Sequence, residues 1–129
     1  MLRVIIVGAG TQGICLLRHL ADVCDVTVLE EHADVGGVWH QQRDSPYASL
    51  QISKNHYRFP DYGPMPRSRA PAKEVQAYLA DYVRHHGLRS HIRFNTKVSR
   101  ISSDCTVYCT DGSVFKADAI CCTGASSYA

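Results

Sequence analysis

Three glycines near the amino terminus have a spacing that suits the binding of a phosphate-containing ligand. Gly8, Gly10 and Gly13 form a GxGxxG pattern, and Glu30 follows seventeen residues after Gly13. In such a pattern the first glycine permits a tight turn, the second lets a pyrophosphate approach the backbone, and the third lets a helix pack closely on a sheet. A carboxylate near the expected offset of roughly 20 residues can accept hydrogen bonds from a ribose diol. The pattern predicts dinucleotide binding, with a purely structural glycine turn as the alternative.

The sequence on either side of these glycines predicts the elements that would position them. A β-branched and aliphatic run over residues 3–7 predicts a strand, and apolar residues that recur with helical spacing after the last glycine predict a helix. A second apolar run at residues 26–29 predicts a strand that ends at the carboxylate. Ala9, Thr11 and Gln12 lie at the start of this helix. There, the unpaired backbone N–H groups and the positive end of the helix dipole would form an anion site.

A second feature is the only tryptophan of the protein, Trp39. It lies in residues 31–46, a polar and turn-rich stretch that we expect to be a loop, shortly after Gly36-Gly37 and next to Val38. Paired glycines favour a turn, and an indole at the edge of a core buries apolar surface while its N–H finds a partner. From the residues alone, a turn beside a core-edge tryptophan is the favoured interpretation.

Residues 46–71 predict an ordered excursion. Their prolines exclude a long helix, and their aromatic residues favour packing on the domain surface or against a ligand over a flexible linker. A helix is then expected from Pro71 to a cap at Gly87. His85 and His86 in its last turn are expected to be solvated, where cations complement the helix dipole. One face of this helix is apolar, with Val75, Tyr78, Leu79, Tyr82 and Val83.

The last third of the chain predicts strands. Those expected cover residues 92–95, 98–102, 106–110, 113–116 and 117–123. Asp111-Gly112 is a strong hairpin signal. Because βαβ crossovers are right-handed, residues 3–7 should lie between the strands at 26–29 and 118–122. The expected fold class is α/β: a Rossmann-like parallel sheet that starts with a βαβ unit and carries an inserted antiparallel β-meander.

Composition and charge narrow the class of protein. The 129 residues suit one domain, and a composition of 45% hydrophobic and 20% charged residues is that of a globular protein rather than of a disordered or membrane chain. A net charge of +2 with scattered histidines gives no basic stripe for nucleic acid. The apolar run at the amino terminus is too short, and too broken by glycine, for a signal peptide or a membrane span.

The cysteines favour a reducing, cytoplasmic setting. None of the six forms a CxxC pair or a metal-type spacing with histidine, so no metal site is expected. We interpret them as small apolar residues, with Cys121 and Cys122 in a buried strand.

Several motifs together resemble a known family. The segments GAGTQG, VGGVW, YASLQIS, FPDYGPMP, IRFNTKV and CTGA resemble, in order and spacing, the N-terminal part of the flavin-containing monooxygenases and their Baeyer–Villiger relatives. The resemblance covers essentially the whole chain, but only about the first third of such an enzyme. It therefore implies a truncated form of a flavoprotein with two dinucleotide-binding domains, in which residues 1–129 form a single FAD-binding domain.

The resemblance implies FAD as the cofactor and a role for each matching residue. Gly8, Gly10 and Gly13 would face the pyrophosphate, and Glu30 the adenosine ribose. Val38 and Trp39 would contact FAD near its isoalloxazine end, and Gly124 would form a second backbone approach to the dinucleotide. The family's Asn after the Tyr-x-Ser-Leu segment has no counterpart, because counting from Tyr47 reaches Ser53 and counting back from Asp61 reaches Gln51. No catalytic residue is therefore assigned.

Other family features are missing from these residues. They contain no second glycine motif for NADPH, the family's co-substrate, and no FxGxxxHxxx fingerprint. The expected function is a flavin-dependent monooxygenase-like oxidoreductase or one component of it, with a second polypeptide or a homo-oligomer to supply the missing half. The alternative is a non-catalytic FAD-binding remnant or regulatory fragment. A disulfide reductase is disfavoured, since no closely spaced redox cysteine pair follows the second strand.

Overall fold

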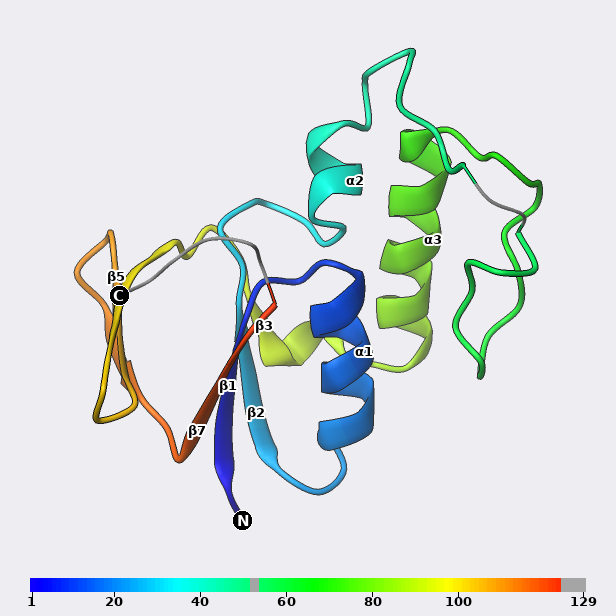
Figure 1. Cartoon of the computed structure of the whole chain (residues 1–129). Helices are drawn as coiled ribbons and strands as arrows, with labels where there is room; N and C mark the ends of the chain where they lie inside the picture. Colours follow the sequence, from blue (N-terminus) through cyan, green and yellow to red (C-terminus); the bar gives the residue numbers. More distant parts are fainter. Residues whose placement is uncertain (52–53, 124–129) are drawn as a thin grey trace.

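A parallel sheet forms the central layer of the protein (Figure 1). The computed structural model describes residues 1–51 and 54–123. Strand β1 (Arg3–Val7) lies between β2 (Asp25–Leu29) and β7 (Ala119–Cys122), and β3 (Ile92–Arg93) pairs with β2. This order, β3-β2-β1-β7, confirms the predicted position of the first strand between the second and the last.

Two helices cover one face of this sheet (Figure 1). Helix α1 (Thr11–Leu20) follows the glycine turn and buries Ile14 and Leu17. Helix α3 (Ala72–His85) begins one residue later than predicted, because Pro71 is its extended N-cap with ψ of 158°. The five predicted apolar residues of α3 are all buried. Gly87, at φ of +65°, follows the end of the helix as expected, and a short 3-10 turn, η1 (Arg89–His91), leads to β3.

The other face carries the predicted antiparallel meander (Figure 1). It consists of β4 (Val98–Ser102), β5 (Thr106–Cys109) and β6 (Val114–Lys116), in the order β4-β5-β6. The turn between β5 and β6 contains Asp111 and Gly112, the latter at φ of +89°. The hairpin prediction is therefore confirmed.

The alternation of side chains along β1 divides the core into two parts. Val4 and Ile6 pack with the helices, whereas Ile5 and Val7 pack with Val98, Val107 and other residues of the meander. This division follows from the two-residue period of a strand, which sends successive side chains to opposite faces. Both faces of β1 are therefore buried, as is usual for a central parallel strand.

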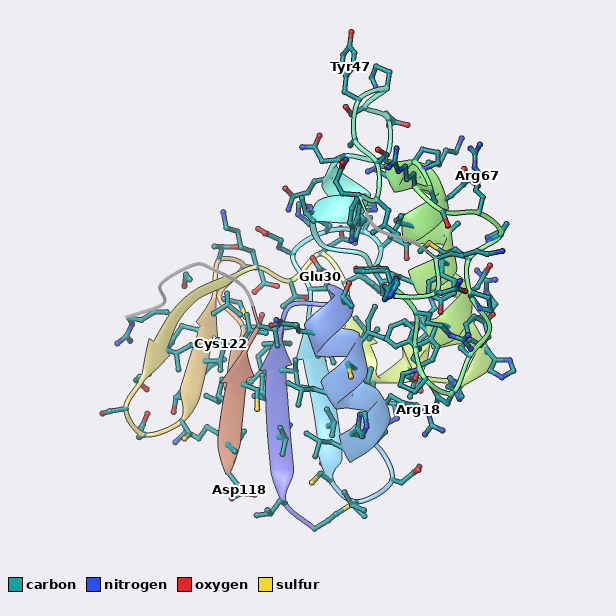
Figure 2. All side chains as sticks on the ribbon, turned by 45° about the vertical axis from the view of Figure 1, so that its right-hand side comes forward. Arg18, Glu30, Tyr47, Arg67, Asp118 and Cys122 are labelled. Carbon is teal, nitrogen blue, oxygen red and sulfur yellow. The ribbon has the colours of Figure 1, made fainter. Side chains whose placement is uncertain are left out.

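The described residues of the excursion, 46–51 and 54–71, run beside α3 (Figure 1). The ends of the excursion are held together, since Leu50 N–H donates to Ala70 O at 2.7 Å and Ala72 N–H donates to Ala48 O at 2.9 Å. Phe59 is buried, and its ring stacks on Tyr82 of α3 with 3.7 Å between the ring centroids. The excursion therefore contributes to the main core, although Tyr47 near its start points away from the protein (Figure 2) and is 91% exposed.

Two expectations about burial are wrong in part. His85 is exposed as expected, but the His86 side chain is only 15% exposed and its ring lies 4.6 Å from that of Tyr82. Burial, and then the nearby positive charge of Arg18, lowers the pKa of His86. Cys122 is exposed and Cys121 half-buried rather than fully buried, because β7 is an edge strand among the described residues, where only β1 pairs with it. Among the described residues, no helix is long and apolar enough to cross a membrane.

Candidate functional site

A cavity of about 820 Å³ lies at the carboxyl ends of β1 and β2. Its size falls within the range of roughly 300–1,000 Å³ that is typical of small-molecule sites. Seven of the residues singled out from the sequence line it: Gly8, Gly10, Thr11, Gln12, Glu30, Val38 and Trp39. Ala9 and Gly13 lie behind its wall, where both are buried. Gly124 lies outside the described residues, so the structure does not place it.

Two of the three motif glycines are required by the protein itself. Gly8 has φ of +103°, a conformation that side chains strongly disfavour. A Cβ on Gly13 would lie 1.9 Å from the carbonyl oxygen of Gly8, so α1 can approach the turn this closely only without a side chain there. Both observations agree with the mechanical roles expected from the pattern.

Gly10 differs, because the protein leaves space for a Cβ at this position. Its φ of −80° is ordinary, and a Cβ would meet only the backbone of Gly37, at 3.7 Å and beyond. Because Gly10 lines the cavity, its missing side chain opens the backbone to whatever occupies that cavity.

The amino terminus of α1 points its backbone donors at the same place. The first helical hydrogen bond runs from Ile14 N–H to Gly10 O at 3.0 Å. The backbone N–H groups of the residues before Ile14 therefore have no carbonyl partner within the helix. No side chain caps this end, and its first turn holds no acidic residue. These are the properties of an anion site at a helix N-terminus.

Glu30 at the end of β2 is 3% exposed (Figure 2). Its Oε1 accepts a hydrogen bond from Ala9 N–H at 2.9 Å, and its Oε2 accepts one from His32 N–H at 2.8 Å. A carboxylate offers about four acceptor positions, so two remain for a ligand in the cavity. Glu30 thus holds the glycine turn in place and can also accept hydrogen bonds from a diol.

The glycine pair packs directly against the glycine turn. Gly36 N–H donates to Ala9 O at 2.9 Å, and a Cβ on Gly37 would lie 3.2 Å from Gly10 Cα. Gly37 has φ of +56° and ψ of −124°, a conformation that suits glycine. Two segments that are well separated in sequence therefore form one wall of the cavity.

The expectation of a plain loop after this pair is wrong at one point. Helix α2 (Val38–Gln41) forms a single turn there. Its bonds run from Trp39 N–H to Gly36 O at 3.0 Å and from Gln41 N–H to Gly37 O at 3.1 Å, so the carbonyl groups of the glycine pair start the turn. This turn brings Trp39 to the cavity, where its indole N–H donates to the hydroxyl of Tyr57 at 3.0 Å.

Several lining residues escaped prediction from the sequence. Thr123 follows β7, and its hydroxyl donates to Val7 O at 2.8 Å. The segment that enters β4, together with Thr110, closes the opposite wall. The available signal was that these residues are polar and flank strand ends, which is where ligands bind in open α/β sheets. The lining residues that were not predicted as site residues are Val7, Leu29, Glu31, His32, Gly36, Gly37, Gln41, Thr96, Lys97, Val98, Ser99, Thr110 and Thr123.

Comparison with known proteins identifies the family. A family model described as flavin-binding monooxygenase-like matches residues 1–114. The chain belongs to the flavin-binding monooxygenase-like family. This agrees with the resemblance found in the sequence motifs.

Sequence relatives of this flavin-binding monooxygenase-like chain are much longer than it is. An FAD-dependent monooxygenase of Fusarium langsethiae is 32% identical over 106 residues, which are 76% of this chain and 18% of the relative. A Baeyer–Villiger monooxygenase of Streptomyces coelicolor is 31% identical over 109 residues, which are 79% of this chain and 20% of the relative. The chain thus spans about a fifth of the length of these relatives.

Solved structures of the family share the fold. A steroid monooxygenase bound to NADP matches with a TM-score of 0.82 and 25% identity, over 95% of this chain and 26% of that one. A flavin-containing monooxygenase from Stenotrophomonas maltophilia matches with a TM-score of 0.80 and 26% identity, over 95% of this chain and 38% of that one. The parallel sheet, helices and meander therefore correspond to part of these enzymes.

Proposed function

We propose that these residues bind FAD and form the FAD-binding part of a flavin-dependent monooxygenase. The observation that carries the proposal is Gly10, because the protein leaves space for a side chain there and that space opens into the cavity. The donors of α1 face the same region, and the carboxylate of Glu30 lies at the end of the neighbouring strand. This combination suits the diphosphate and ribose of a dinucleotide.

Each predicted contact has a place in this proposal. Gly10 and the amino terminus of α1 would hold the diphosphate, and Glu30 would accept hydrogen bonds from the adenosine ribose. Val38 and Trp39 would lie toward the isoalloxazine end, and Gly124 would approach the dinucleotide from beyond the described residues. When bound, FAD supplies the redox chemistry, while the protein positions and shields it.

The reaction of the family also needs NADPH, and the solved steroid monooxygenase has NADP bound. The 129 residues contain one GxGxxG pattern, which the FAD proposal uses. We infer that an NADPH site would come from other residues, either of a longer chain or of a second polypeptide or second copy. These would approach the carboxyl ends of the strands around Trp39. The alternative is a non-catalytic FAD-binding remnant. It predicts that no second polypeptide or second copy restores fast reduction of the bound flavin by NADPH, whereas the proposal predicts that the missing residues would restore it.

We also propose a cytoplasmic location. All six cysteines are free in the structure, and free thiols suit a reducing compartment. Fractionation of cells that express a tagged chain tests this, with recovery in the membrane or secreted fraction as the contrary result.

A titration of the purified chain tests the cofactor. The emission of Trp39, the only tryptophan, reports occupancy because this residue lines the cavity. We expect FAD to change the emission saturably and ADP to compete with FAD. NADP⁺ should compete poorly, since Glu30 repels a 2′-phosphate. Equal competition by NADP⁺, or no binding of FAD, would overturn the assignment.

A further inference from the structure

A chain of hydroxyl groups links the excursion to the amino terminus of α1. The hydroxyl of Tyr57 accepts a hydrogen bond from Trp39 Nε1 at 3.0 Å and lies 2.6 Å from Thr11 Oγ1. Tyr57 and Thr11 are 46 residues apart in the sequence. Tyr57 therefore joins three segments: the excursion, α2 and the first turn of α1.

Thr11 lies between two cavities. It lines the large cavity together with Trp39, and it also lines a cavity of about 120 Å³ together with Tyr57 and Phe59. Tyr57 lines only the smaller one of the two. Viewed from the large cavity, Tyr57 thus supports Thr11 from behind without itself forming the wall.

The chemistry of the donors fixes the direction of one hydrogen bond in this network. An indole N–H can only donate, so the Tyr57 oxygen is the acceptor from Trp39. Within residues 1–51 and 54–123, the only other partner of the Tyr57 hydroxyl is Thr11. Either hydroxyl of the Tyr57–Thr11 pair can donate to the other. When the phenolic proton goes to Thr11 Oγ1, the Thr11 proton is available for an acceptor in the large cavity.

We propose that Tyr57 is a positioning residue for the bound dinucleotide. By donating to Thr11, it directs the Thr11 hydroxyl proton toward the diphosphate, and it holds the Trp39 indole at the opposite side of the network. Each bond in such a chain polarises the next, which strengthens the final donor. The inference rests on the proposed FAD site and adds a residue of the excursion to it.

The test compares Tyr57→Phe with Tyr62→Phe. Both changes remove one phenolic hydroxyl from the excursion, but Tyr62 lines neither cavity. Tyr57→Phe should weaken FAD and ADP binding about 3- to 10-fold, the range expected for one hydrogen bond. It should leave the binding of adenosine, which has no phosphate, unchanged. It should also shift the Trp39 emission maximum, because the indole N–H loses its acceptor. Tyr62→Phe should do none of these.

A double-mutant cycle with Thr11→Ala tests whether Tyr57 acts through Thr11. If it does, Tyr57→Phe should have little further effect on FAD affinity once the Thr11 hydroxyl is gone. Additive effects of the two substitutions, or an unchanged FAD affinity in Tyr57→Phe, would overturn this inference. The proposed FAD site would still stand in that case, provided that the wild-type chain binds FAD. If the wild-type chain bound no FAD, both the proposed function and this inference would fail.

Discussion

Gly13 and Gly10 are both glycines for different reasons, so replacing each with alanine should have a different effect. Gly13→Ala should destabilise the fold by about 1–3 kcal/mol or more, because its Cβ would clash with Gly8 O at 1.9 Å. Gly10→Ala should leave the urea midpoint almost unchanged but weaken FAD binding about tenfold or more, since its Cβ enters the ligand's space. Normal FAD affinity in Gly10→Ala would contradict the diphosphate placement.

Glu30 serves both the fold and the ligand, so its removal should affect both. Glu30→Ala leaves Ala9 N–H and His32 N–H without their acceptor and removes the proposed ribose contact. We expect FAD affinity to fall by about one to two decades, or roughly 1.5–3 kcal/mol, together with a loss of stability. Asp22→Ala removes the same charge from a side chain that is 85% exposed and lines neither cavity, so it serves as the control. Equal FAD affinities for Glu30→Ala and Asp22→Ala would exclude the ribose role.

At the scale of elements, Asp61 holds the excursion against both helices. Its carboxylate accepts a hydrogen bond from Tyr82 of α3 at 2.8 Å and one from Arg18 of α1 at 3.0 Å. His86 Nε2 lies 3.4 Å from the same carboxylate. Burial acts to raise the pKa of Asp61, but the hydrogen bonds from Tyr82 and Arg18 outweigh it and lower the pKa below its usual value of 3.8.

This lowered pKa predicts a pH dependence of stability. A group whose folded-state pKa is lowered stabilises the fold above its unfolded pKa, and that contribution is lost as the pH falls through the folded pKa. The stability advantage of wild type over Asp61→Asn should therefore be present at neutral pH and shrink below about pH 4. Urea midpoints measured from pH 7 to about pH 2.5 would show it.

The control for this experiment is Asp44→Asn, a change at a side chain that is 85% exposed. Its stability should follow that of wild type across the acidic range. An advantage of wild type over Asp61→Asn that persisted unchanged at the lowest pH would show that the carboxylate charge is not what stabilises this contact.

For the molecule as a whole, we expect the FAD-loaded 129-residue chain to be reduced slowly by NADPH. Its single GxGxxG pattern is assigned to FAD, so NADPH has no second phosphate cradle here to bring it to the flavin. Such proximity can contribute about 7–11 kcal/mol to lowering a barrier. Anaerobic stopped-flow absorbance would measure the rate, with the steroid monooxygenase whose structure has NADP bound as the positive control. Fast, saturable bleaching would show that these residues hold a complete reductive site.

The sequence determined those parts of the fold that depend on neighbouring residues. Continuous apolar runs located β1 and β2, and an apolar spacing near 3.6 residues located α1 and α3, since both patterns depend only on neighbouring residues. The positive φ of Gly8 and of Gly112 follows from glycine's lack of a Cβ. The position of β1 between β2 and β7 was also predictable, because the hand of a βαβ crossover is fixed.

The tertiary structure alone decided the contacts between distant segments. Gly37 packs on Gly10, Tyr57 reaches Thr11, and His86 is buried against Tyr82 although its place near a helix end suggested solvation. The Gly37–Gly10 and Tyr57–Thr11 contacts do not follow from local spacing, and His86 is covered in part because Asp61 of the excursion lies 3.4 Å from its Nε2. Each depends on how the excursion and α2 fold back over α1 and α3. The glycines and the carboxylate of the site were therefore readable in the sequence, whereas the wall that encloses them was set by long-range packing.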